Sequence, residues 1–307
     1  MALNWPGLLA WSTKYHDGTA PSQFKQLSDE DREFLEKAME EAFGQIEDPN
    51  KLMQEAIAQI NSEDRTDMTI ATALEILDKC CDDPDCARNA EKLGGIQPLL
   101  DLLETQTGAL QCRTMEILAL FFANNPHIQK VAVERGAMKA FLKLTRESPK
   151  GSEQLSKSFR TLVALVRQVQ EFEEYFLRQQ SGMDIIVACL DIEEDANLRS
   201  KALSFARSLT GDGRLRPEEA DALMAAITPL FASVSAMKLQ YRECLSECVQ
   251  ELATIFPTRC TPALVAAVEA RLEELKKAAD PETHQETGLL LEARVAFTAP
   301  PVAAKAA

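Results

Sequence analysis

The chain has 307 residues, a formal net charge of −15 and a pI near 4.8. It is long enough to bury an ample core, and its acidity argues against nucleic acid or an anionic membrane as the main partner. Its eight cysteines are irregularly spaced, and it shows neither an apolar run of about 20 residues nor a basic segment ahead of its apolar N-terminus. We therefore predict a cytoplasmic protein with reduced thiols and no signal peptide or transmembrane helix.

The first predicted elements are an arm and a pair of capping helices. Residues 1–25 contain both tryptophans among Gly and Pro and follow no steady period, which predicts a mobile N-terminal arm. Leu8, Leu9 and Trp11 form a short amphipathic segment within it. Residues 26–62 are predicted to form capping helices, opened by Ser28 as an N-cap and by Pro49 at a first helical position.

The centre of the chain repeats with a period of 41 residues. An apolar block of four residues is followed by a glycine three times: 74–77 with Gly95, 115–118 with Gly136, and more weakly 162–165 with Gly182. Periods of about 40–47 residues with helical patterning are typical of armadillo and HEAT solenoids. We therefore predict an all-α, right-handed armadillo-repeat solenoid of about four repeats over residues 63–277, a fold that builds binding surfaces.

Each repeat is predicted to contain a long helix, a shorter helix and a third helix after a glycine. The first two units are expected at 66–81, 84–93 and 96–103, then at 110–123, 126–134 and 137–146. Pro84 and Pro126 suit first helical positions, and Gly95, Gly136 and Gly182 suit a left-handed bend. In the armadillo arrangement the third helix lies outside and the next long helix lines the concave surface.

Beyond the second unit the pattern weakens. A third unit is predicted at 154–190, a fourth long helix at 196–209, and less regular helices from Pro217, Lys238 and Thr261 to about Lys277. Residues 278–307 end in an Ala- and Pro-rich segment and are predicted to be a flexible tail.

One stretch of this acidic chain is basic. Residues 139–167 carry seven basic and two acidic side chains. This block is either a solvated face or a surface complementary to an acidic protein partner, and the sequence leaves both interpretations open. Arg160 and Arg167 fall on one side of the third long helix, and Arg199 and Lys201 open the fourth.

Nothing in the sequence indicates catalysis or a resident cofactor. The three histidines are scattered, and phosphate-loop, zinc-protease and serine-hydrolase motifs do not occur. Cys80, Cys81 and Cys86 lack metal-ligand spacing, and Cys244 with Cys248 suits burial on one helical face better than a metal. We predict no catalytic residue, no metal and no cofactor.

Several motifs resemble the armadillo-type nucleotide exchange factors of heat shock protein 70 (Hsp70). They are LLAWS at 8–12, SDEDREFLEKAMEEAF at 28–43, the dipeptides DP at 48–49, LM at 52–53 and EA at 55–56, ALEIL at 73–77, ARN at 87–89 and LGG at 93–95. The resemblance covers about residues 8–210 and fades after Gly211. It implies a co-chaperone whose concave surface binds the Hsp70 ATPase domain and accelerates ADP release, which promotes client release without any covalent step.

The resemblance also implies where the chaperone binds. It points to the turn from Asp85 to Asn89, with Ala87 as a close contact, and to a basic contact at the start of the fourth long helix. The predicted chaperone-binding set is Asp85, Ala87, Arg88, Asn89, Arg113, Arg160, Arg167, Arg199 and Lys201, of which Arg160 and Arg167 come from helical geometry and local charge. We expect a monomer.

Two alternatives remain open. Family members have a mobile N-terminal segment that competes for the chaperone's peptide-binding domain, so Leu8, Leu9 and Trp11 are either a client-release ligand or a cap on the first repeat. The second alternative is that the whole chain is a generic armadillo interaction scaffold without exchange activity. A peptide-binding groove would need tryptophans on its inner helices, and both tryptophans here lie in the N-terminal arm.

Overall fold

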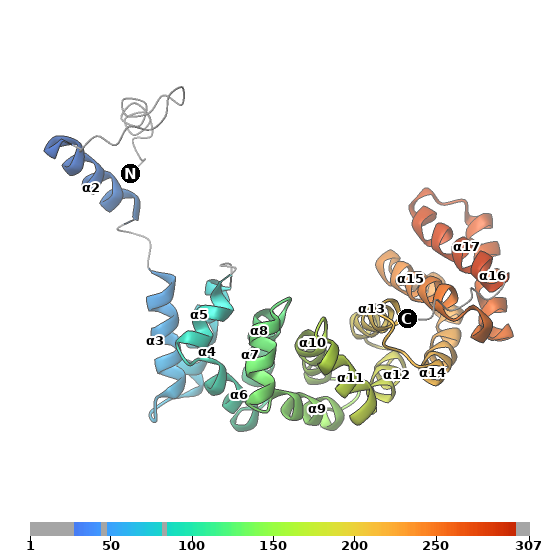
Figure 1. Cartoon of the computed structure of the whole chain (residues 1–307), viewed down its shortest axis with the longest axis horizontal. Helices are drawn as coiled ribbons and strands as arrows, with labels where there is room; N and C mark the ends of the chain where they lie inside the picture. The colour runs from blue at the N-terminus through green and yellow to red at the C-terminus, as the bar shows by residue number, and fades with distance from the viewer. Residues whose placement is uncertain (1–27, 44–47, 82–84, 299–307) are drawn as a thin grey trace.

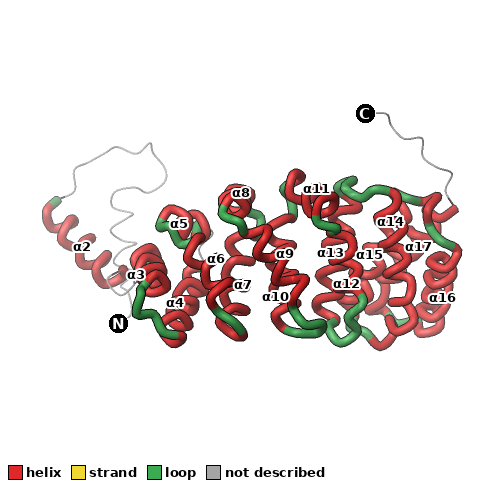
Figure 2. Tube along the Cα trace, turned by 90° about the horizontal axis from the view of Figure 1, so that it is seen from below, coloured by secondary structure: helices red, strands yellow, loops and turns green. Residues whose placement is uncertain are grey.

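The structure is a computed structural model that describes residues 28–43, 48–81 and 85–298. Every regular element in these ranges is a helix. The helices from residue 49 onward stack into an open crescent, and the helix at 29–43 stands apart from the stack (Figure 1). Seen from below, the same helices form one continuous row (Figure 2). The described part of the chain is therefore an all-α solenoid, in which each layer contacts mainly its neighbours.

The helices follow the predicted order. Two N-terminal helices, α2 (Asp29–Phe43) and α3 (Pro49–Asn61), precede the repeats. The repeats contain α4 (Asp67–Cys80), α5 (Cys86–Lys92) and α6 (Ile96–Thr105); α7 (Gly108–Phe122), α8 (Pro126–Glu134) and α9 (Ala137–Glu147); α10 (Glu153–Val166), α11 (Gln170–Gln179) and α12 (Gly182–Leu190). Then come α13 (Ala196–Gly211), α14 (Pro217–Ile227) and η1 (Thr228–Ala236); α15 (Leu239–Ile255), η2 (Pro257–Arg259), α16 (Pro262–Ala278), η3 (Pro281–Thr283) and α17 (His284–Thr298).

Local sequence signals explain the helix starts. Ser28 Oγ accepts a hydrogen bond from the Asp31 amide at 3.2 Å, and Asp48 caps α3 ahead of Pro49 by accepting from the Asn50 amide at 2.9 Å. Pro126 begins α8 as predicted. The predicted start at Pro84 lies outside the described residues, and α5 begins at Cys86.

The core is distributed between layers instead of filling one centre. Phe122 of α7 packs edge-on against Phe141 of α9, with ring centroids 6.1 Å apart, and Phe176 of α11 lies 5.7 Å from Phe205 of α13. The first pair joins two helices of one repeat and the second joins adjacent repeats, so aromatic packing in the middle of the stack is local.

The bends before the third helices are made in two ways, and the prediction of a left-handed glycine is right only for Gly136. Gly136 has φ +89°, whereas in the first unit the left-handed residue is Gly94 and in the third it is Ser181. Gly182 is needed for space, because a Cβ there would clash with the Phe176 ring and lie 2.8 Å from the Phe176 carbonyl oxygen. Gly95 approaches Ile57 closely in the same way.

The predicted flexible tail from residue 278 is wrong for residues 281–298. These residues form η3 and α17, and α17 packs against α15 and α16 with Leu290 and Ala293 fully buried. The buried Glu286 carboxylate accepts a hydrogen bond from Arg271 Nε at 2.7 Å. A buried ion pair therefore anchors a helix whose apolar pattern alone is weak. Residues 299–307 lie outside the described part.

No helix among the described residues is both long enough and apolar enough to cross a lipid bilayer.

Candidate partner-binding surface

The long helices α7, α10 and α13 line the inside of the crescent, and α6, α9 and α12 lie on its outside (Figure 1). This is the predicted arrangement of inner and outer helices. One face of each long helix packs on its own layer, and the opposite face carries polar side chains toward the hollow. The inner wall is therefore the surface on which the predicted binding residues have to be located.

A ladder of ion pairs connects the first three long helices. Arg113 of α7 contacts Asp78 of α4 at 2.7 Å and Glu116 at 2.9 Å, and Glu116 also accepts a hydrogen bond from Lys157 of α10. Burial acts to raise the pKa of Glu116, but the hydrogen bonds from Lys157 and Arg113 outweigh it and hold that pKa below its ordinary value. The Arg113 side chain therefore has two acidic partners within the protein and is still partly exposed to solvent.

Three other basic side chains form a cluster without acidic partners. The basic cluster consists of Arg160 of α10, Arg167 directly after the end of α10, and Lys201 of α13, and none of the three forms an ion pair within the described ranges. Burial lowers the pKa of Lys201, and the positive charges of Arg167 and Arg160 lower it further. The inner wall therefore holds uncompensated positive charge in a protein of net charge −15.

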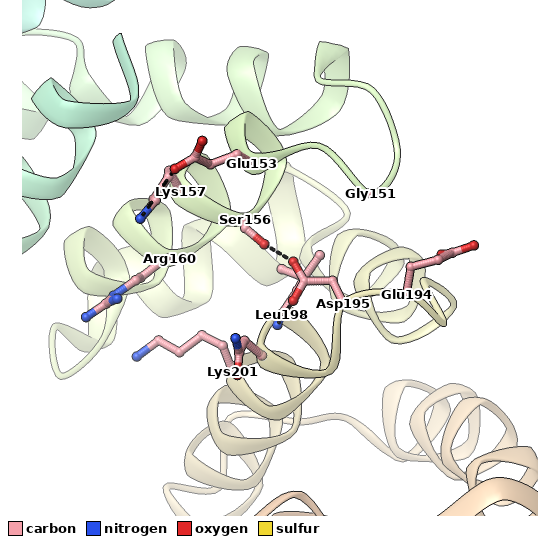
Figure 3. A pocket seen from close by; sticks show the side chains of 10 residues that line it. Gly151, Glu153, Ser156, Lys157, Arg160, Glu194, Asp195, Leu198 and Lys201 are labelled. Atoms are coloured by element: carbon pink, nitrogen blue, oxygen red, sulfur yellow. Dashed lines mark hydrogen bonds and ion pairs between the residues drawn. The ribbon is translucent and has the colours of Figure 1, made fainter. Parts of the chain in front are cut away.

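A cavity of about 610 Å³ lies between α10 and α13 beside this cluster. Figure 3 shows the Arg160 and Lys201 side chains extending the same way from the two helices. At the other side of the cavity Ser156 donates a hydrogen bond to Asp195, which also caps α13. This hydrogen bond joins the two helices, and the Arg160 and Lys201 side chains extend away from it (Figure 3).

Arg199 does not belong to this surface, so its predicted role as an exposed contact is wrong. Its side chain is only 4% exposed, and its Nε donates a hydrogen bond to the Leu190 carbonyl oxygen at 2.8 Å. Residues two positions apart point to different sides of a helix, so Arg199 and Lys201 cannot share a face. Arg199 joins α13 to the end of α12 inside the stack.

The second predicted contact region is the start of α5. Asp85 and Arg88 are exposed, with Asp85 Oδ1 3.8 Å from Arg88 Nη1, and Asn89 is partly exposed. Ala87 is 7% exposed, so its methyl group packs mainly inside the repeat and offers little contact area. Helix α5 lies several layers away from the basic cluster along the crescent (Figure 1), so one partner has to span several repeats to touch both.

Some of the predicted residues cannot be placed, and some relevant ones were not predicted. Leu8, Leu9 and Trp11 lie outside the described residues. The sequence reasoning missed Glu116 and Lys157, which hold the ladder together. Their separation of 41 positions equals the repeat period and could have revealed the pair, because equivalent positions of adjacent repeats lie side by side.

Comparisons with solved structures define the class of protein. The chain is similar to an engineered protein (TM-score 0.63, 19% identity, covering 80% of this chain and 97% of that one). It is also similar to a designed armadillo repeat protein in complex with the peptide (KR)4 (TM-score 0.61, 16% identity, covering 79% and 99%) and to computationally designed armadillo repeat proteins for modular peptide recognition (TM-score 0.63, 17% identity, covering 78% and 99%). The chain is an armadillo-repeat protein.

Sequence comparison shows which proteins the chain resembles. Residues 6–90 match the model of the nucleotide exchange factor Fes1. The Hsp70 nucleotide exchange factor FES1 of Eremothecium gossypii is 25% identical over 182 residues, 57% of this chain and 63% of that relative. The Hsp70 nucleotide exchange factor FES1 of Kluyveromyces lactis is 26% identical over 166 residues, which are 54% of this chain and 56% of that relative. The resemblance to the armadillo-type exchange factors is confirmed, and the chain spans less than two thirds of these relatives' length.

Proposed function

We propose that this protein is a nucleotide exchange factor of Hsp70. The observation that carries the proposal is the Fes1 match over residues 6–90, joined to an armadillo crescent whose inner wall carries the basic cluster. In this proposal the crescent binds the chaperone's ATPase domain in an open form that holds ADP weakly. ADP leaves, ATP enters and the client is released, with no covalent bond made or broken by the factor.

The inner wall gives this binding a physical basis. Arg160, Arg167 and Lys201 are a site for carboxylates of the chaperone. The pKa of Lys201 is lowered first by burial and then by the charges of Arg167 and Arg160, and an acidic partner would offset that repulsion. The exposed start of α5 would contact a second part of the same domain through Arg88 and Asn89. Two contacts several repeats apart would favour one relative arrangement of the chaperone's lobes and disfavour the other.

The proposal includes the compartment and the oligomeric state. All eight cysteines are unbridged, which supports a reducing compartment, and we place the protein in the cytoplasm as a monomer. We further propose that the arm, through Leu8, Leu9 and Trp11, competes for the chaperone's peptide-binding domain. Deleting residues 1–25 should then slow client release while nucleotide exchange continues, and unchanged client release would reject the role of the arm.

The test of the main proposal is release of a fluorescent ADP analogue from cytosolic Hsp70 with and without the protein. The wild type should accelerate release, and Arg160→Glu/Lys201→Glu should reduce that acceleration by about tenfold or more, because two attractive contacts become repulsive. Arg199 is left unchanged in this variant because it is buried.

The matched control is Lys139→Glu/Lys143→Glu, which makes the same charge change at exposed positions of the outer helix α9. It should keep full activity, and both variants should keep the helical circular dichroism of the wild type. Equal activity of the two variants would show that the basic cluster is not the contact. Binding of Hsp70 without faster ADP release would instead support an armadillo scaffold without exchange activity.

A further inference from the structure

Two thiols meet where α4 ends and α5 begins. Cys81 follows the last residue of α4, Cys86 is the first residue of α5, and their Sγ atoms lie 3.6 Å apart. Cys81 is partly exposed and Cys86 is 3% exposed. The sulfurs are therefore in van der Waals contact, with one of them open to a small reactant from solvent.

Neighbouring interactions select this pair from the other cysteines. Cys80 precedes Cys81 in the chain, but it is buried and its Sγ lies 3.6 Å from the Pro49 carbonyl oxygen at the start of α3. Cys81 is more exposed, and its Sγ contacts the Leu77 carbonyl oxygen of α4 at 3.2 Å as well as Cys86 Sγ. Cys244 and Cys248 lie one turn apart on α15, and burial raises the pKa of both thiols, that of Cys248 to about 12. Because the thiolate is the reactive form, the α15 pair is protected from oxidation.

We propose that Cys81 and Cys86 are a modification site at which a peroxide forms a reversible disulfide. The Cys81 thiolate attacks one oxygen of hydrogen peroxide, the O–O bond breaks and Cys81 becomes a sulfenic acid. The other oxygen leaves as hydroxide and takes up the proton that the thiol had lost, which gives water. The Cys86 sulfur then attacks the Cys81 sulfur, the S–O bond breaks and a second water leaves. Two thiols and one peroxide thus give one disulfide and two waters, and a dithiol reductant reverses the change.

The disulfide would act on α5. An S–S bond is about 2.05 Å long, so the two sulfurs must approach by about 1.5 Å. Helix α5 has seven residues and packs against α3, α7 and α8 mainly through Ala87 and Ala90, so it can shift more easily than the long helices. Arg88 and Asn89 would move with it. If the proposed Hsp70 contact is correct, oxidation should weaken binding, a consequence that rests on the proposed function.

The chemistry can be tested without the chaperone. Trypsin cleavage after Lys79 and Arg88 releases Cys80, Cys81 and Cys86 in one peptide. After peroxide treatment and alkylation, the wild-type peptide should carry one alkyl group, on Cys80, and lack two hydrogens. Cys81→Ser should carry alkyl groups on both remaining thiols. Cys86→Ala should form no disulfide within this peptide and should keep Cys81 as a sulfenic acid, and Cys244→Ser should behave as the wild type. Three alkyl groups on the treated wild type, or an equal loss of hydrogens in Cys81→Ser, would overturn the proposal.

The consequence for binding is measured separately on the full chain. Oxidised wild type should bind the Hsp70 ATPase domain about fivefold more weakly than reduced wild type, the lower end of typical couplings between sites. A dithiol should restore binding, and Cys81→Ser should respond to neither treatment. A mapped disulfide with unchanged binding would remove the proposed control of α5 but not the modification site. No binding in either redox state would count against the proposed function alone.

Discussion

Lys201 has no acidic partner among the described residues of the inner wall. It is partly buried, its side chain extends the same way as that of Arg160 (Figure 3), and its pKa is lowered by burial and by the charges of Arg167 and Arg160. A lysine with a lowered pKa in the folded state is disfavoured in its charged form. This penalty on folding is present below the folded pKa and disappears as the pH rises from the folded to the unfolded pKa.

Lys201→Gln should therefore make the free protein more stable while weakening its binding to the proposed partner. Removing the like-charge repulsion should contribute about 0.5 kcal/mol, or roughly 1–2 °C in Tm for a chain of this size. The gain should shrink in strongly alkaline buffer and at high salt, where the wild-type charge is lost or screened. Thermal unfolding followed by circular dichroism at two pH values measures this. A lower Tm for Lys201→Gln at neutral pH would contradict the account.

Individual residues differ in how far the sequence could predict them. Arg160 and Lys201 lie 41 positions apart, as do Glu116 and Lys157, so the repeat period alone brings each pair together across adjacent layers. Arg199 was mistaken for a surface contact because its charge suggested exposure. Its hydrogen bond to the Leu190 carbonyl oxygen depends on how α12 ends, and no spacing in the sequence shows that.

At the scale of elements, the bends set the spacing of the layers. Ser181 supplies the left-handed residue before α12, and Gly182 then allows the chain to pass directly against Phe176 of α11. Phe176 in turn packs on Phe205 of α13. The absence of a side chain at Gly182 thus keeps three helices in register.

Gly182→Ala should be destabilising by about 1–3 kcal/mol, because the added methyl meets both an aromatic ring and a backbone oxygen that cannot move independently. Gly288→Ala in α17 is the matched control, since nothing lies within 4 Å of its added methyl. It should instead be stabilising by up to about 1 kcal/mol through helix propensity. Urea unfolding of both variants compares them directly, and a neutral Gly182→Ala would show that α11 and α12 can separate without loss.

The elements themselves were largely predictable, with α17 as the exception. Helices α8 and α9 follow from a first-turn proline, an apolar stripe and the glycine between them. Helix α17 has no comparable stripe. It is held by Glu286, a charged residue that sequence patterns assign to the surface, through its buried contact with Arg271 of α16. A tertiary ion pair cannot be inferred from composition, and for that reason the segment was predicted to be mobile.

At the scale of the whole molecule, the described helices form a crescent with a concave wall, and helix α5 and the basic cluster lie several layers apart on it. A rigid frame of this kind can act on a two-lobed partner only by binding one arrangement of the lobes more tightly than another. Under the proposed function, weaker nucleotide binding would follow from this difference in affinity alone.

This linkage leads to a quantitative prediction for the proposed function. If the protein weakens ADP binding to Hsp70 by a given factor, ADP must weaken binding of the protein to Hsp70 by the same factor, because the coupling free energy belongs to the ternary complex. Titration calorimetry can measure the two ratios independently, using the Hsp70 ATPase domain with and without each ligand. We expect ratios of about 5–150, typical of coupled sites.

Arg160→Glu/Lys201→Glu then separates affinity from coupling. If the basic cluster contacts the chaperone equally in its open and closed forms, the variant should bind more weakly while the ratio stays unchanged. If the cluster contacts only the open form, both should fall together, since only differential binding shifts the equilibrium. A wild-type ratio of one, with tight binding to Hsp70, would mean that the crescent holds the chaperone without distinguishing its nucleotide states, and exchange by this mechanism would be ruled out.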